Sequence, residues 1–178
     1  ATVSICAAGR EVARATALFL RRSDTPHEDA VGRGIAPLAG PDGLKTTPMI
    51  PAEALHLVPP GFHREVELRW APGRSPKAPA GWFRLPMSLL AGKPTGAFVR
   101  AATLSDLGNA IAGLALRAAQ SSAAAYINPD MTLYLQRNPR GEWIGLELDT
   151  IGEADGVGLS HVRLHDTEGA FGHTLSAR

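Results

Sequence analysis

The sequence predicts an α+β fold in which a long antiparallel sheet wraps around one central helix. Three observations support this prediction. Within residues 62–178, one segment, 103–118, has helical periodicity, two segments with strand alternation precede it, and four more follow it. A single amphipathic helix among so many strands has to bury its apolar face against the sheet, so the order of the elements favours this arrangement.

The predicted helix begins at Thr103, and Asp106 follows three residues later in a pattern that resembles a capping box. This pattern assigns Asp106 to capping. Apolar residues then recur at helical spacing, at Leu104, Leu107, Ile111, Leu114, Ala115 and Ala118. Small residues between them make the helix slim, namely Gly108, Ala110, Ala112 and Gly113. A slim helix lets a sheet approach its backbone closely, which fits a central position.

The strand predictions depend on alternation of apolar and polar residues with a period of two. Before the helix, residues 63–71 and 82–90 form two predicted strands, and Pro86 interrupts the second at a bulge or sheet edge. After the helix, four antiparallel strands are predicted in meander order at 131–136, 143–150, 157–165 and 170–177. In the second of these four, Thr150 is predicted to share the apolar face of Leu148.

The beginning of the chain predicts a hairpin, with strands at 2–6 and 11–20 around a tight turn at Ala8-Gly9-Arg10. An isolated hairpin is marginal in water, so residues 1–22 are interpreted as the closing hairpin of an N-terminal domain whose remainder is absent. A trimmed N-terminus explains this most simply, and a natural or designed short form is the alternative. Residues 23–61 are rich in proline and glycine and predict a linker, and residues 62–178 form the C-terminal domain.

The composition excludes several classes of protein. The formal net charge is +1 with basic residues scattered along the chain, so neither nucleic acid nor an anionic membrane is an expected partner. No apolar run is long enough to span a bilayer. The single cysteine, Cys6, permits no intramolecular disulfide, and charged residues interrupt the first apolar stretch of the chain, so a cytoplasmic location is expected.

Several short motifs occur in order along the second part of the chain. They are Ser105-Asp106-Leu107-Gly108-Asn109, the segment from Tyr126 to Arg137 that contains Asn128-Pro129-Asp130, Gly141-Glu142-Trp143, the segment 155–159 and the segment 164–172. Together they resemble the second half of TesB-like acyl-CoA thioesterases of the thioesterase-like superfamily. Such proteins are double hotdogs, with two tandem copies of a sheet wrapped around a helix. The resemblance covers residues 60–178, and it implies that residues 1–22 are the closing strands of the first hotdog.

The resemblance implies that the protein, when full length, hydrolyses a fatty acyl-CoA thioester with a water molecule oriented by Asp130 and Thr150. It places a third site residue at Ser176, or at Ala177 if the alignment shifts by one, where the family usually has glutamine. From the residues alone, Asn-Pro-Asp is also a turn signal, and threonine is common in strands. In this family the oxyanion donors are commonly amides at a helix N-terminus, which the other hotdog can supply.

The absent glutamine favours an alternative, a non-catalytic acyl-CoA-binding or assembly module of the same fold. No cofactor and no metal site is predicted, because His161, Arg163 and His165 alternate with apolar residues and are interpreted as the solvent side of a strand. A dehydratase would require a histidine near the helix and ranks last. The open sheet edge predicts a homo-oligomer, or pairing with the missing N-terminal hotdog.

Overall fold

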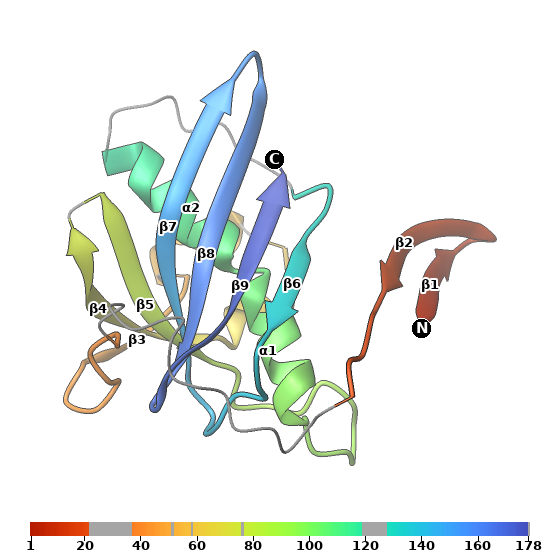
Figure 1. The fold of residues 1–178 in the computed structure, drawn as a ribbon, viewed down its shortest axis with the longest axis horizontal. Coiled ribbons are helices and arrows are strands. Elements are labelled where there is room, and N and C mark those ends of the chain that lie inside the picture. The colour runs from red at the N-terminus through yellow and green to blue at the C-terminus, as the bar shows by residue number, and fades with distance from the viewer. Residues whose placement is uncertain (22–36, 51, 58, 76, 119–127, 178) are drawn as a thin grey trace. The chain divides into compact units, whose positions relative to one another are not determined.

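The computed structural model describes residues 1–178 except 22–36, 51, 58, 76, 119–127 and 178 (Figure 1). The chain divides into two compact units, residues 1–35 and residues 36–178. In the first unit, β1 (Thr2–Ala7) and β2 (Arg10–Thr16) form an antiparallel hairpin. Ala8 and Gly9 both have positive φ, 49° and 74°, as a two-residue type I′ turn requires. The predicted hairpin is confirmed, but its second strand ends at Thr16.

The second unit contains a seven-stranded antiparallel sheet in the order β3-β4-β5-β7-β8-β9-β6. The strands are β3 (Thr46–Pro48), β4 (Glu67–Ser75), β5 (Ala78–Arg84), β6 (Thr132–Leu135), β7 (Ile144–Ala154), β8 (Val157–Asp166) and β9 (Gly169–Ala177). The predicted long antiparallel sheet is confirmed. The meander order of the last four strands is wrong, because β6 pairs with β9 at the edge of the sheet. The buried start of β7, residues 144–148, explains its central place, whereas β6 contains no buried residue.

Two helices cover one face of this sheet, α1 (Ala97–Ser105) and α2 (Gly108–Ala118), and short 3-10 helices lie at η1 (Ala52–Leu57) and η2 (Phe62–Arg64) (Figure 1). The helix begins at Ala97 rather than at Thr103, so the predicted start is wrong. Thr103 lies inside α1, and Asp106 is the residue at its C-terminal end. No described helix is both long enough and apolar enough to cross a membrane.

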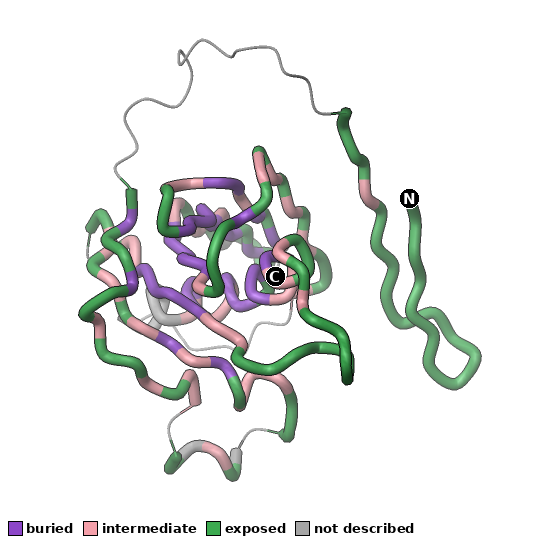
Figure 2. Tube along the Cα trace, turned by 90° about the horizontal axis from the view of Figure 1, so that it is seen from below, coloured by how far each residue is buried: buried purple, intermediate pink, exposed green. Residues whose placement is uncertain are grey.

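The main core fills the space between the helices and the sheet face that they cover, which we call the inner face (Figure 2). Its fully buried members include Phe83, Leu104, Ile111, Leu146, Leu164 and Phe171. Gly108 allows the close approach that the slim helix predicts, because a Cβ there would lie 3.2 Å from Cγ2 of Val162 on β8. The central, wrapped helix is therefore confirmed by packing against the middle of the sheet.

A smaller core lies on the opposite face of the sheet, the outer face, around Leu38, Ala80 and Trp82. Trp82 Nε1 donates a hydrogen bond to the carbonyl of Ala39 at 2.7 Å, so the segment near residue 39 packs against the sheet. The same stretch of chain then enters the sheet as β3. The linker predicted over 23–61 is therefore wrong for residues 38–48, and its part at 23–36 lies outside the described residues. Isolated apolar residues such as Leu38 pack in irregular structure, which has no periodicity to detect.

The second predicted strand, 82–90, also ends earlier than expected. β5 stops at Arg84, and residues 85–90 form a loop with no strand hydrogen bonds apart from an isolated bridge at Leu90. Pro86 has no N–H to donate to a neighbouring strand, which explains why the strand terminates there instead of continuing through a bulge.

Candidate active site

Asp130 and Ser176, two of the predicted site residues, lie at the same end of the sheet, where β6 begins and β9 ends. Oδ1 of Asp130 accepts a hydrogen bond from the amide of Ala177 at 3.0 Å. Asp130 is exposed, whereas Ser176 is only 6% exposed. Because Ala177 directly follows Ser176, the carboxylate of Asp130 also fixes the chain that carries the Ser176 hydroxyl.

Thr150 lies on the other face of the sheet from Ser176. A β-bulge between Leu148 and Thr150 adds Asp149 to β7 and shifts the alternation by one residue. Ile151 therefore takes the inner-face position and packs against the main core, and Thr150 is exposed opposite His161. The prediction that Thr150 shares the face of Leu148 is wrong, and the structure does not bring Thr150 to Asp130 and Ser176.

Two further hydroxyls lie near Ser176 on the inner face. Ser160 on β8 is directly opposite Ser176 in the strand register and is 2% exposed. Thr174, two residues before Ser176, is 1% exposed and faces the start of α2, where a Cβ on Gly108 would lie 3.7 Å from its Oγ1. Both residues were missed in the sequence analysis. Ser160 could have been found, because it lies two residues before Val162 and four before Leu164 and so shares their face of the strand.

Asp106 brings a second carboxylate to this region. It lies at the break between α1 and α2, is exposed, and its Oδ1 is 3.4 Å from Nδ2 of Asn128. Oδ1 of Asn128 is buried and has no hydrogen-bond partner among the described residues. Capping was the predicted role of Asp106, and its position at the C-terminal end of α1 makes that interpretation wrong. The carboxylate is thus available for other chemistry.

Two polar contacts therefore lie at the helix break and at the ends of β6 and β9, one between Asn128 and Asp106 and one between the amide of Ala177 and Asp130. We call Asp106, Asn128, Asp130 and Ser176 the polar cluster. Carboxylates can accept a proton from water, and an amide and a hydroxyl can orient that water. Within the described part of the chain, no group of three or more His, Cys, Asp or Glu side chains is arranged to hold a metal ion. The two carboxylates of the cluster are acid–base groups, and Asn128 and Ser176 are hydrogen-bonding groups.

A second set of ionisable residues occupies the outer face and is separate from this cluster. Glu147, 1% exposed, accepts a hydrogen bond from Nε of Arg74 at 2.9 Å and lies 3.2 Å from Nε2 of His165. The prediction of a solvent side is wrong for Arg163 and His165, which are 5% and 0% exposed. Burial lowers the pKa of His165, although the carboxylate of Glu147 opposes this shift. Such buried charges are tolerated because each contacts an opposite charge.

Beyond these residues, Asp149 and His161 extend the outer-face set toward β9. Nδ1 of His161 is 3.0 Å from Oδ2 of Asp149, and its Nε2 is 3.1 Å from Nδ1 of His173. The hydrogen bond from Arg74 lowers the pKa of Asp149 despite partial burial. The whole set lies across the sheet from Ser176, so it does not border the polar cluster.

A model of the acyl-CoA thioesterase C-terminal domain family matches residues 41–174. The chain belongs to this family. The predicted family membership is thereby confirmed for most of the C-terminal unit, including the helices and every strand of the seven-stranded sheet except the last residues of β9. No curated protein matches the sequence.

Solved structures resemble this thioesterase domain in fold. A protein of Novosphingobium aromaticivorans DSM 12444 named "putative thioesterase" has a TM-score of 0.64 at 20% identity, and the match covers 99% of this chain and 64% of that protein. A second protein named "putative thioesterase", from Syntrophus aciditrophicus SB, has a TM-score of 0.49 at 11% identity. The match covers 66% of this chain and 86% of that protein. The sheet order and the first of these likenesses identify the fold as a hotdog, as predicted.

Proposed function

We propose that this domain takes part in hydrolysing a fatty acyl-CoA thioester at the polar cluster. The observation that supports the proposal is that Asp130 accepts a hydrogen bond from the amide that follows Ser176, in a member of an acyl-CoA thioesterase family. Asp106 and Asn128 approach the same end from the helix break. Four polar groups near the start of a helix are the kind of arrangement that a water-dependent acyl transfer requires.

In the proposed reaction, the oxygen of water attacks the thioester carbonyl carbon while a carboxylate accepts the water proton. Asp130 has one oxygen bonded to Ala177 and can use the other, and Asp106 is the second carboxylate within the cluster. Amides at the start of α2 are suitable donors to the developing oxyanion. The carbon–sulfur bond then breaks, and the CoA thiolate leaves and takes up a proton. The proposal omits Thr150, because the bulge places it on the outer face.

A non-catalytic acyl-CoA-binding module is the second candidate. It is favoured by Ser176, whose short hydroxyl stands where the resembling enzymes have a glutamine amide of longer reach. In that case the polar cluster orders water or the acyl carbonyl without turnover, and pairing with another hotdog domain completes an assembly instead of an active site.

Thiol release from acyl-CoA substrates of several chain lengths tests the proposal. Asp130→Asn and Asp106→Asn are compared with the wild type, and Asp155→Asn in the β7–β8 turn is the matched control. Losing the carboxylate that accepts the proton lowers kcat by about 10²–10⁴-fold. Acyl-CoA binding without any thiol release supports the binding module, and full activity in both aspartate variants contradicts the proposed site.

A further inference from the structure

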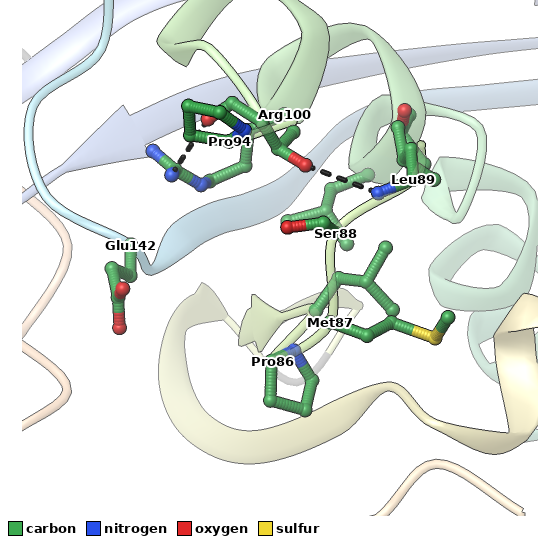
Figure 3. A pocket seen from close by; sticks show the side chains of 11 residues that line it. Pro86, Met87, Ser88, Leu89, Pro94, Arg100 and Glu142 are labelled. Carbon is green, nitrogen blue, oxygen red and sulfur yellow. Dashed lines mark hydrogen bonds between the residues drawn. The ribbon is translucent and has the colours of Figure 1, made fainter. Parts of the chain in front are cut away.

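A cavity of about 190 Å³ lies beside α1, and no residue of the polar cluster lines it (Figure 3). Its walls come from the loop after β5, from α1 and from the turn before β7. Leu85, Met87 and Leu104 contribute apolar surface, and Ser88, Arg100 and Glu142 contribute polar groups. An opening lined by both kinds of group suits a ligand with a charged part and a less polar part.

Arg100 is held rigidly in the wall of this cavity. Its Nη1 donates to the carbonyl of Gly141 at 2.9 Å, and its Nη2 donates to the carbonyl of Thr95 at 3.1 Å. These bonds use two of the five N–H donors of the guanidinium. The guanidinium is therefore oriented before any ligand arrives, which lowers the entropy that binding would cost.

Backbone carbonyls orient Arg100 without neutralising its charge. Arg74, Arg84 and Arg137 each contact a carboxylate. Within the described ranges of the chain, no carboxylate lies at ion-pair distance from Arg100, and the guanidinium donates to two backbone carbonyl oxygens. An oriented, partly buried guanidinium with spare donors matches the geometry of a phosphate or carboxylate, which accept two parallel N–H bonds.

We propose that this cavity binds a phosphate group in the CoA portion of the substrate through Arg100. The inference rests on the proposed function, because acyl-CoA supplies the phosphate. Arg100 lies in α1, and Asp106 follows six residues later, at the C-terminal end of that helix. The phosphates of CoA are separated from the thioester by the pantetheine arm, so an anion site some distance from the reacting carboxylates is what this substrate requires.

Substitutions of Glu142 and Ser88 are expected to change the affinity for CoA in opposite directions. Its side chain lines the cavity, is 68% exposed and lies 3.4 Å from Arg84. Removing its charge in Glu142→Gln reduces repulsion of the phosphate, so affinity for CoA rises about two- to threefold. Placing a carboxylate on the opposite wall in Ser88→Asp weakens binding without disturbing the carbonyl bonds of Arg100.

Calorimetric titration with CoA, dephospho-CoA and pantetheine tests the inference directly. Arg100→Gln weakens CoA binding about tenfold or more, as loss of a hydrogen bond to a charged group predicts, and leaves pantetheine binding unchanged. If dephospho-CoA binds as tightly as CoA, the diphosphate is the bound group; if it binds as weakly as pantetheine, the bound group is the 3′-phosphate. Lys77→Gln, an equal charge change on the exposed β4–β5 turn, is the control.

The result that overturns the inference is an unchanged affinity for CoA in both Arg100→Gln and Ser88→Asp, or an equal loss for pantetheine. If Arg100→Gln fails to fold by circular dichroism, the opposite shifts of Ser88→Asp and Glu142→Gln decide the question. Phosphate-dependent binding without hydrolysis leaves this inference standing and overturns the proposed function. If Arg100→Gln and Ser88→Asp hydrolyse acyl-CoA with an unchanged KM, the proposed function stands and this inference is overturned.

Discussion

The carboxylate of Asp130 accepts a hydrogen bond from the amide of Ala177 at 3.0 Å, which ties the segment before β6 to the end of β9. One side chain therefore has a structural contact and, in the proposed function, a chemical role. The two roles use different properties of the group. The hydrogen bond needs an acceptor oxygen, whereas proton transfer from water needs the carboxylate charge.

We predict that Asp130→Asn separates these roles. The amide keeps an acceptor oxygen for Ala177, so the free energy of unfolding changes by less than about 0.5 kcal/mol, while hydrolysis falls. Asp130→Ala loses the acceptor as well and destabilises by about 1 kcal/mol. Urea unfolding and thiol release on the same preparations check this. Equal destabilisation by both variants would show that the charge, and not the acceptor, maintains the contact.

Thr150→Val is predicted to leave hydrolysis and stability close to those of the wild type. Thr150 is exposed on the outer face, and valine is at least as favourable in a strand. We expect kcat/KM to stay within about twofold and the unfolding free energy within about 0.5 kcal/mol. A larger loss of kcat at constant stability would show that Thr150 belongs to the site. It would also require that β7 has no bulge between Leu148 and Thr150.

Gly145→Ala is predicted to destabilise the domain by about 1–3 kcal/mol, as overpacking does. Its Cβ would lie 3.0 Å from Cβ of His165, 3.0 Å from Cδ2 of Leu38 and 3.1 Å from Cζ3 of Trp82. Gly152→Ala, on the same strand with no atom within 4 Å of the added Cβ, is the matched control and should be tolerated. Equal midpoints of urea unfolding for the two variants would mean that residues near 38 do not pack on the outer face.

The outer face predicts a loss of stability in mild acid. Burial lowers the pKa of His173, as do the electrostatic effects of nearby His161 and Arg163, and burial also lowers the pKa of His165. Both folded pKa values lie below the ordinary value of about 6.5, so the unfolded chain binds more protons just below that pH. The stabilisation is complete above pH of about 6.5 and is lost as the pH falls.

Urea unfolding at pH 8, 6.5 and 5.5 measures this dependence, with His173→Gln as the comparison variant. The variant should lose less stability between pH 8 and pH 5.5 than the wild type does. The groups around the two histidines are Arg74, Glu147, Asp149, His161 and Arg163. Identical pH profiles for wild type and variant would assign the acid sensitivity to other groups. A further loss below pH of about 4 is expected as Asp149, whose pKa is lowered by Arg74, becomes protonated.

Asp166 contributes to the same acid sensitivity at a lower pH. Burial raises the pKa of Asp166, but hydrogen bonds from Arg137 and from the amides of Arg140 and Glu168 outweigh it, so the pKa lies below its usual range. Asp166→Asn puts an N–H group among these donors and is predicted to cost about 3 kcal/mol of unfolding free energy. Thermal unfolding at pH 7 measures the cost, and a change under about 1 kcal/mol would contradict it.

Much of the fold followed from local sequence patterns. Alternation placed β4, β6, β8 and β9 within a few residues, and turn chemistry placed the first hairpin, because these depend on neighbours along the chain. The helix start was missed because the N-cap residue of α1 is Gly96, which has no side chain to accept a capping hydrogen bond and so leaves no polar signal in the sequence. The packed segment at 38–48 was missed because its contacts, such as Trp82 with Ala39, join residues far apart in sequence.

For the candidate site, the motifs of the chain were enough to indicate the hotdog family, because motifs and spacing are properties of the sequence, and the resemblance implied Asp130 and Ser176, whose roles stay predictions. Only the tertiary structure decided which of the predicted residues lie on the same side and at the same end of the sheet. The bulge at Asp149 moved Thr150 to the outer face, and the early helix start released Asp106 from capping. A one-residue shift reverses every later side chain in a strand, and nothing in the local pattern of β7 reveals where that shift occurs.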